Sequence, residues 1–158
     1  MPRLFVAISP SLPTAQRLLD ELAPLSLPEH RPVPAPQVHL TVLFVGETGV
    51  RQLDHVCESV RRAASGVRAF HLRVHTLATF PLDAPPRLLA AVTNQPPELL
   101  EIRDRLVRRL AKSPRQKTGD RFVPHLTLCR FPPGTTMEPS ELELSEHVFH
   151  VEHIVLFE

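Results

Sequence analysis

Tryptophan and tyrosine are absent from this chain of 158 residues, and cysteine occurs only at Cys57 and Cys129. Neither cysteine has a Cys or His neighbour at metal-ligand spacing, so the sequence indicates neither a disulfide framework nor a zinc site. No apolar run approaches the length of a membrane span, and the short apolar opening ends at Pro10, too early for a secretory signal. We therefore expect a cytoplasmic protein with free thiols and no membrane partner.

A large net charge of either sign is also absent, because 18 Lys and Arg residues face 17 Asp and Glu residues, for a net charge of +1. This balance excludes a protein that coats nucleic acid by bulk electrostatics, but it leaves room for a local basic surface. Basic residues concentrate in one segment: Arg103, Arg105, Arg108, Arg109, Lys112, Arg115, Lys117 and Arg121. Taken alone, this segment is typical of a solvated helix face and loop. It runs directly into the second motif described below, however, so a polyanionic ligand would pass over it.

The pattern of apolar residues predicts one domain over residues 1–158 with a mixed order of strands and helices. Strands are expected at residues 4–8, 38–45, 70–80, 87–93, 122–130 and 148–157, and helices at 15–22, 50–64 and 97–112. Thr48 is expected to cap the second helix, whose apolar side carries Val50, Leu53, Val56, Val60 and Ala64. Several strands follow one another without a helix between them, so an α+β fold is favoured over a doubly wound sheet.

The most informative feature is a short internal repeat, VHLTV at residues 38–42 and PHLTL at residues 124–128. In an extended strand, His and Thr two residues apart project to the same side, about 6.6 Å apart along the backbone. The Leu and Val residues beside them then face the core. Two such strands placed side by side would bring two imidazoles and two hydroxyl groups into one cleft, which is the arrangement of a reaction centre.

The residue types of the repeat suit the opening of a cyclic phosphodiester. That reaction needs one group to take a proton from water and another to give a proton to the departing oxygen, on opposite sides of phosphorus. Two histidines, His39 and His125, can share these tasks near neutral pH without a metal ion. The hydroxyl groups of Thr41 and Thr127 can donate hydrogen bonds to the non-bridging oxygens, and Arg130 can add a charge-assisted bond.

A structural interpretation competes with the catalytic one. Either His-Thr pair alone is more typical of a half-buried strand residue with satisfied hydrogen bonds, and only the repetition favours catalysis. The other histidines do not predict a metal site. In a strand, His150 would point opposite to His147 and His153, while His71 and His75 would lie about 13 Å apart on an exposed face.

These motifs, together with the opening residues 3–8, the stretch 44–47 and the stretch 122–130, resemble the 2H phosphoesterase superfamily. Within it, the chain is most similar to the bacterial and archaeal RNA 2′,3′-cyclic phosphodiesterases, also called 2′-5′ RNA ligases. The resemblance extends from Arg3 to about Phe157. It implies a bilobal α+β fold with pseudo-two-fold symmetry, in which antiparallel sheets line a central cleft, helices lie outside, and each lobe contributes one motif.

The resemblance also implies an activity. Members open 2′,3′-cyclic phosphates at RNA ends to 2′-phosphomonoesters without a metal or nucleotide cofactor, and some join tRNA halves through a 2′-5′ linkage. Carried over, His39 is the acid facing the ribose 3′-oxygen and His125 is the base. Thr41, Thr127 and Arg130 then bind the phosphate. The expected partner is RNA with a cyclic phosphate end, and a monomer is expected.

By the same resemblance, Phe44 stacks on the nucleobase, and the absence of Trp and Tyr leaves stacking to Phe and Arg. Phe44 and Arg130 nevertheless lie at odd offsets from their histidines, so simple alternation would turn both side chains away from the cleft. A bulge or a twist at the strand end must redirect them if they are to take part.

Two further functions stay open at this point. A module that holds an RNA-terminal phosphate without turnover would use the basic segment and Phe44 equally well, but it would not need two histidines, since Arg and Lys bind phosphate without titrating. A sister enzyme acting on ADP-ribose 1″,2″-cyclic phosphate, oligoadenylate or another 2′-5′ linkage would use the same motif chemistry.

Overall fold

The computed structural model describes residues 1–111 and 122–158. Half of the basic segment, namely Lys112, Arg115, Lys117 and Arg121, therefore lies outside the described residues. The basic track expected beside the second motif accordingly stays a prediction.

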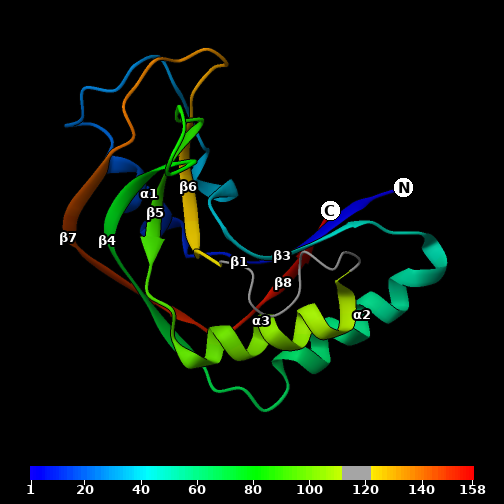
Figure 1. Ribbon diagram of the computed structural model, residues 1–158. Coiled ribbons are helices and arrows are strands. Elements are labelled where there is room, and N and C mark those ends of the chain that lie inside the picture. Colours follow the sequence, from blue (N-terminus) through cyan, green and yellow to red (C-terminus); the bar gives the residue numbers. More distant parts are fainter. Residues whose placement is uncertain (112–121) are drawn as a thin grey trace.

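Helices and strands alternate in the described ranges much as the apolar pattern predicts (Figure 1). The strands are β1 (Arg3–Ile8), β2 (Arg31–Pro32), β3 (Leu40–Glu47), β4 (Phe70–Phe80), β5 (Leu88–Thr93), β6 (His125–Arg130), β7 (Glu141–Val151) and β8 (Val155–Phe157). The helices are α1 (Leu12–Asp20), α2 (Val50–Ala64), α3 (Pro97–Leu110) and a short 3-10 turn, η1 (Ala35–Gln37). None of these helices has the length and apolar character that a membrane crossing requires.

All of these strands belong to one eight-stranded sheet in the order β7-β4-β5-β6-β3-β1-β8, with β2 paired to β6 beside this path. Every pairing in it is antiparallel. The two halves of the sheet meet at β3 and β6, which are joined through the pair Leu40 and Leu126. The motif strands therefore occupy the centre of the sheet, and the α+β expectation is confirmed.

One face of the sheet packs against the helices to form the core. Leu40 and Leu126 are completely buried there, as are Leu18 of α1 and Leu99 and Leu106 of α3. Figure 1 shows α2 and α3 side by side, and α1 behind β4 and β5. Helices on one face leave the other face of the motif strands free for a site.

The helix termini follow recognisable capping chemistry, with one correction. Ser11 caps α1, because its hydroxyl oxygen accepts a hydrogen bond from the Thr14 backbone N–H at 3.3 Å. Thr48 was expected to cap α2 in the same way, but Gly49 holds that position and the Thr48 hydroxyl donates to the Gly46 carbonyl. The expected cap on α2 is therefore wrong.

The inward face of α2 also differs from the expectation. Val50 is 87% exposed and Leu53 is 39% exposed, whereas Val56, Val60 and Ala63 are buried. The first turn projects beyond the sheet and covers no core surface. Apolar side chains in that turn consequently have nothing to pack against.

The C-terminal strand expected at residues 148–157 is two strands. β7 begins much earlier, at Glu141, and ends at Val151, and residues 152–154 connect it to β8 on the opposite edge of the sheet. Most side chains of β7 are exposed, because β7 is an edge strand that pairs with only one neighbouring strand, β4. The sequence pattern did not predict its first half, because the exposed positions there carry charged residues and form no apolar run.

Candidate active site

The pairing of β3 with β6 brings the two motifs together. Leu40 and Leu126 are partners in an antiparallel ladder, so continuing the register by one residue places His39 beside Thr127 and Thr41 beside His125. All four side chains are half-buried, while both leucines point into the core. The expected gathering of two imidazoles and two hydroxyl groups on one face therefore follows from the observed register.

Both imidazoles are held by the same backbone contact. His39 Nδ1 lies 2.7 Å from the carbonyl oxygen of Gln37, and His125 Nδ1 lies 2.7 Å from the carbonyl oxygen of Val123. A carbonyl oxygen can only accept a hydrogen bond, so Nδ1 of each ring carries the hydrogen. Each Nε2 is left to give or take a proton, which is the state a catalytic imidazole needs.

Aromatic rings fix the two imidazoles further, in different ways. The His125 ring is stacked on Phe80 of β4, with centroids 4.6 Å apart. The His39 ring lies 5.2 Å from Phe5 and 6.4 Å from Phe157. The patterning of the sequence did not single out these three phenylalanines, because they come from strands outside the motifs.

A β-bulge in β3 redirects Phe44. One extra residue, Val42, lies between Thr41 and Leu43, which pair with consecutive residues of β1. Val42 and Leu43 are both buried, so the alternation of faces shifts by one residue at this point. Phe44 thereby returns to the His39 face, where the residue is 64% exposed and its ring centroid lies 6.2 Å from that of Phe5.

An equivalent bulge in β6 redirects Arg130. Leu128 is the extra residue between Thr127 and Cys129, which pair with consecutive residues of β5. Leu128 and Cys129 are both buried, and Arg130 is exposed. Strand alternation required a bulge or strand-end twist for both side chains, and each strand has a bulge between the threonine and the residue concerned.

Burial has an electrostatic consequence next to the second bulge. Desolvation raises the pKa of the Cys129 thiol to about 11, against a smaller opposing effect of a hydrogen bond from the Leu89 backbone. The side chain belongs to the core, and the thiol stays protonated at neutral pH. Cys129 is therefore a packing residue beside the site and not a nucleophile in it.

The polar groups of the site have unused hydrogen-bonding capacity. Over residues 1–111 and 122–158, the hydroxyl groups of Thr41 and Thr127, the guanidinium of Arg130 and both Nε2 atoms have no protein partner. The hydroxyl groups and the guanidinium can donate to an anion, and each Nε2 can do so when its ring is protonated. Phe44 and Arg130 lie beyond it at opposite ends, because β3 and β6 run antiparallel.

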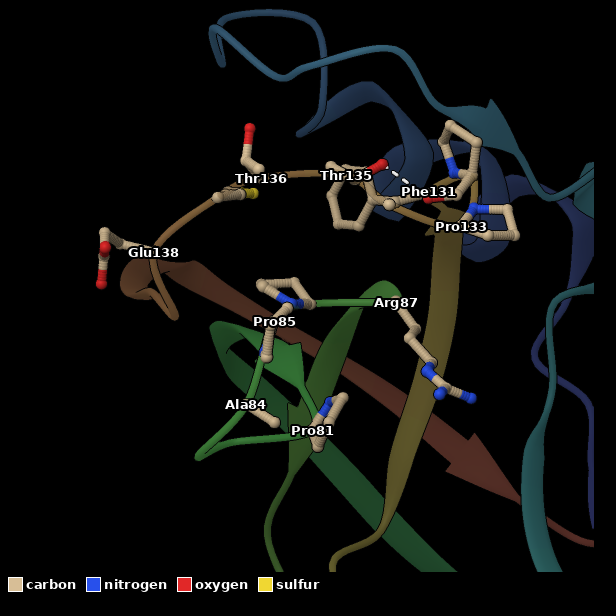
Figure 2. Close-up of a pocket in the computed structure, with 13 residues that line it drawn as sticks. Pro81, Ala84, Pro85, Arg87, Phe131, Pro133, Thr135, Thr136 and Glu138 are labelled. Atoms are coloured by element: carbon tan, nitrogen blue, oxygen red, sulfur yellow. Dashed lines mark hydrogen bonds between the residues drawn. The ribbon is translucent and has the colours of Figure 1, made fainter.

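Two cavities lie past the end of β6 and share the wall Phe131–Pro133. The larger, of about 1240 Å³, is lined mainly by the segments 81–87 and 131–138 (Figure 2). The smaller, of about 510 Å³, contains Arg130 and also Arg31 of β2. Arg31 and Arg87 were missed in the sequence because neither belongs to a motif.

The remaining histidines have separate contacts. His147 Nε2 lies 2.8 Å from Glu21, and His150 Nδ1 lies 3.3 Å from Nε2 of His71, its cross-strand partner. His153 follows β7 and is exposed, as is His75. In the part of the chain that the structure describes, no group of three or more His, Cys, Asp or Glu side chains is placed to hold a metal ion.

Two His-Thr strands that meet at the centre of one antiparallel sheet define a 2H phosphoesterase. A family model described as the 2′-5′ RNA ligase superfamily matches residues 10–158, and the chain belongs to this family. No curated protein matches the chain significantly in sequence.

Solved structures give the same assignment. TT0787 of Thermus thermophilus superimposes with a TM-score of 0.76 at 25% identity, covering 98% of this chain and 87% of that one. Escherichia coli LigT complexed with NADP+ gives 0.75 at 26% identity, with 98% and 85% covered. The MHV ns2 PDE domain gives 0.59 at 13% identity, with 99% of each chain covered, which shows a shared fold.

Proposed function

We propose that this chain is an RNA 2′,3′-cyclic phosphodiesterase that forms 2′-phosphomonoesters by acid/base catalysis between His39 and His125. The observation that carries the proposal is that both imidazole rings are held by the same Nδ1 hydrogen bond, called the brace below. Each Nδ1–H is bound to a carbonyl oxygen two residues earlier, at 2.7 Å in both motifs, and each Nε2 is free. Two equivalent, oppositely placed Nε2 atoms suit one phosphate between them.

The proton transfers balance without a further reagent. Neutral His125 takes a proton from water at Nε2 while the water oxygen attacks phosphorus. The bond from phosphorus to O3′ breaks, and protonated His39 gives its Nε2 proton to O3′. The product is a 2′-phosphate, and exchange with solvent restores both rings. Neither step requires a metal ion or a nucleotide cofactor.

The groups around the histidines have complementary tasks in this proposal. Thr41 and Thr127 donate to the non-bridging oxygens, each from the strand opposite its partner histidine. Arg130 adds a charged donor on one side, where the negative charge grows in the transition state. Phe44 offers an exposed ring on the other side for the nucleobase. Their placement at opposite ends favours one orientation of the nucleotide, with its nucleoside at the Phe44 end.

Relatives support a nucleotide and phosphate ligand. Escherichia coli LigT has been crystallised with 3′-AMP, with ATP and with phosphate, at 24–26% identity to this chain. Its membership of the same structural group makes a nucleotide the first ligand to test here. The family description also names 2′-5′ RNA ligation, the reverse type of reaction, in which a ribose 5′-hydroxyl replaces water.

The position of bond cleavage tests the proposal. The purified protein, with and without EDTA, is incubated with the four 2′,3′-cyclic mononucleotides and with an oligonucleotide that ends in a cyclic phosphate. Phosphorus NMR should show the 2′-phosphate and no 3′-phosphate, at the same rate in both conditions. A dominant 3′-phosphate would mean that the acid and base are exchanged or the nucleotide is reversed.

Two other results would count against the proposal as a whole. Tight binding of the cyclic nucleotides without turnover would indicate an RNA-end binding module. Loss of activity in EDTA with recovery on adding a divalent ion would remove the metal-independent mechanism. Cytoplasmic location, a monomeric state and tRNA halves as the natural substrate are further expectations, which gel filtration and cell fractionation would check in part.

A further inference from the structure

Two further arginines, Arg31 and Arg87, lie beside Arg130 at the C-terminal end of β6. Arg31 is the direct cross-strand partner of Arg130 in the β2–β6 ladder. The carbonyl oxygen of Arg87 accepts a hydrogen bond from the Phe131 backbone N–H at 2.8 Å. Figure 2 shows the Arg87 side chain pointing away from the prolines of the larger cavity, in the direction of β6.

This cluster carries uncompensated positive charge. All three arginines are exposed, and within the described ranges no carboxylate lies at ion-pair distance from any of them. Like charges directly opposite each other on neighbouring strands destabilise a sheet. Placing Arg31 opposite Arg130 therefore costs stability unless an anion binds between them.

The smaller cavity provides a space for that anion. Its volume of about 510 Å³ lies in the range of small-ligand sites, and its lining is Glu29, His30, Arg31, Pro32, Arg130, Phe131, Pro132 and Pro133. His30 has the same brace as the catalytic pair, with Nδ1 at 2.8 Å from the Pro28 carbonyl oxygen. Glu29 supplies one carboxylate against two guanidinium groups, so the lining favours an anion.

The distance along β6 separates this cavity from the reacting phosphate. Arg130 lies three residues beyond Thr127, about 10 Å of strand, and Arg31 lies one strand to the side. Arg130 is long enough to reach back to the histidines. Arg31 starts from the neighbouring strand at the far end, so it serves a different group.

We propose, on the basis of the proposed function, that this cavity is a second phosphate subsite. It holds an RNA phosphodiester next to the reacting phosphate, and Arg31 is a specificity residue that favours oligonucleotides over mononucleotides. The planar guanidinium fork of Arg31 matches a phosphate geometrically. The apolar wall Phe131–Pro133 can contact the sugar or base attached to it.

Two strands of RNA have the required chemistry. One is the strand that ends in the cyclic phosphate, through its last internucleotide linkage. The other is a strand with a free 5′-hydroxyl, which would enter from the His125 side. Substrates and inhibitors distinguish them: a dinucleotide with a 2′,3′-cyclic phosphate end tests the first, and a 5′-hydroxyl dinucleotide without a terminal phosphate, used as a competitor, tests the second.

The experiment compares wild type, Arg31→Ala, Arg31→Lys and the control Arg51→Ala, an exposed arginine on α2. If the first strand occupies the subsite, the kcat/KM of wild type should be at least about tenfold higher for the cyclic dinucleotide than for the cyclic mononucleotide. If the second does, wild type should bind the 5′-hydroxyl dinucleotide at least about tenfold more tightly than the corresponding nucleoside. Arg31→Ala should remove most of that preference, Arg31→Lys should retain part of it, and Arg51→Ala should retain all of it. Added salt should lower the preference in wild type.

A preference of wild type that survives in Arg31→Ala would overturn the subsite, and so would equal use of mononucleotide and dinucleotide. Absence of turnover on every substrate would instead refute the proposed phosphodiesterase. In that case binding tests the subsite: calorimetry compares the affinity for a dinucleotide 3′-phosphate with that for a mononucleotide 3′-phosphate. Tighter binding of the dinucleotide by wild type and by Arg51→Ala, but not by Arg31→Ala, would support the subsite. Equal affinity of wild type for the two ligands would reject it.

Discussion

The two strands that carry the motifs, β3 and β6, are alike as far as the bulge and differ beyond it. Both present His and Thr on the open face, both brace Nδ1 on a carbonyl oxygen at 2.7 Å, and both insert one extra residue after the threonine. The next exposed side chain is Phe44 in one strand and Arg130 in the other.

The side chains around the two strands differ in the same way, aromatic beside β3 and basic beside the end of β6. His39 lies among phenylalanines, Phe5 and Phe157, whereas the end of β6 lies among arginines, Arg31 and Arg87. The common part of each strand is suited to proton transfer, which needs two equivalent groups. The part that differs gives the site a direction, with an aromatic end for a base and a cationic end for phosphate.

The largest expected effect concerns the common part. His39→Ala and His125→Ala should each lower kcat for a 2′,3′-cyclic mononucleotide by at least about two orders of magnitude, because each removes a proton-transfer partner. The control His75→Ala, an exposed histidine on β4, should retain wild-type rates. Circular dichroism should show the same fold in all variants. A silent substitution at either position would contradict the paired mechanism.

The part that differs should respond asymmetrically. Arg130→Ala should lower kcat/KM by about 10²-fold, an effect typical of losing a donor to transition-state charge. Arg130→Lys should not restore it, since lysine lacks the planar fork. Phe44→Ala should mainly raise KM, by roughly fivefold or more, the range of one lost base stack. Steady-state kinetics distinguishes the effect of Arg130→Ala from that of Phe44→Ala. Equal effects of the two substitutions on kcat would contradict the assignment of one end of the site to the base and the other to phosphate.

The threonines test whether the two strands contribute equally. Thr41→Val and Thr127→Val keep the shape of the side chain but remove the hydroxyl donor, and each should lower kcat/KM by about tenfold, less than Arg130→Ala. Cross-strand symmetry predicts similar losses. A loss at only one position would show that the phosphate sits off centre.

The smallest expected effect concerns Cys129, whose counterpart in β3 is Leu43. Burial raises the pKa of the Cys129 thiol to about 11, so at pH 8 a maleimide should label the half-buried Cys57 and leave Cys129 intact until the protein unfolds. Mass spectrometry of the labelled peptides reads this out, with Cys57→Ser as the control. Activity should be unchanged by labelling, and rapid labelling of Cys129 would show that the bulge opens.

Regular patterns made much of the fold predictable. Period-two alternation located β4 at its observed bounds, and helical spacing placed Leu99, Ile102, Leu106 and Leu110 of α3 in the core. β2 and β8 were not found as separate strands, because two or three residues are too short to show a period. The N-terminal turn of α2 was misread because its apolar residues do not reach the sheet.

The site was predictable to the same extent. Alternation alone placed His39, Thr41, His125 and Thr127 on one face, and the register agrees. The Nδ1 contacts join each histidine to the residue two positions earlier and are local. The stacking of Phe80 on His125 and the approach of Arg31 to Arg130 depend on contacts between distant segments. No local pattern in the sequence encodes these contacts.

The paired bulges have a consequence for how such chains are compared. A strand repeats every two residues, and an inserted residue acts as a half-period phase shift, after which odd positions take the role of even ones. Phe44 and Arg130 are each five positions from their histidine, on the same side only after this shift. A regular strand, in which Leu128 took an ordinary paired place, would turn the Arg130 side chain toward the core without altering any motif residue. The spacing between histidine and the fifth residue is therefore as much a part of the motif as the histidine itself.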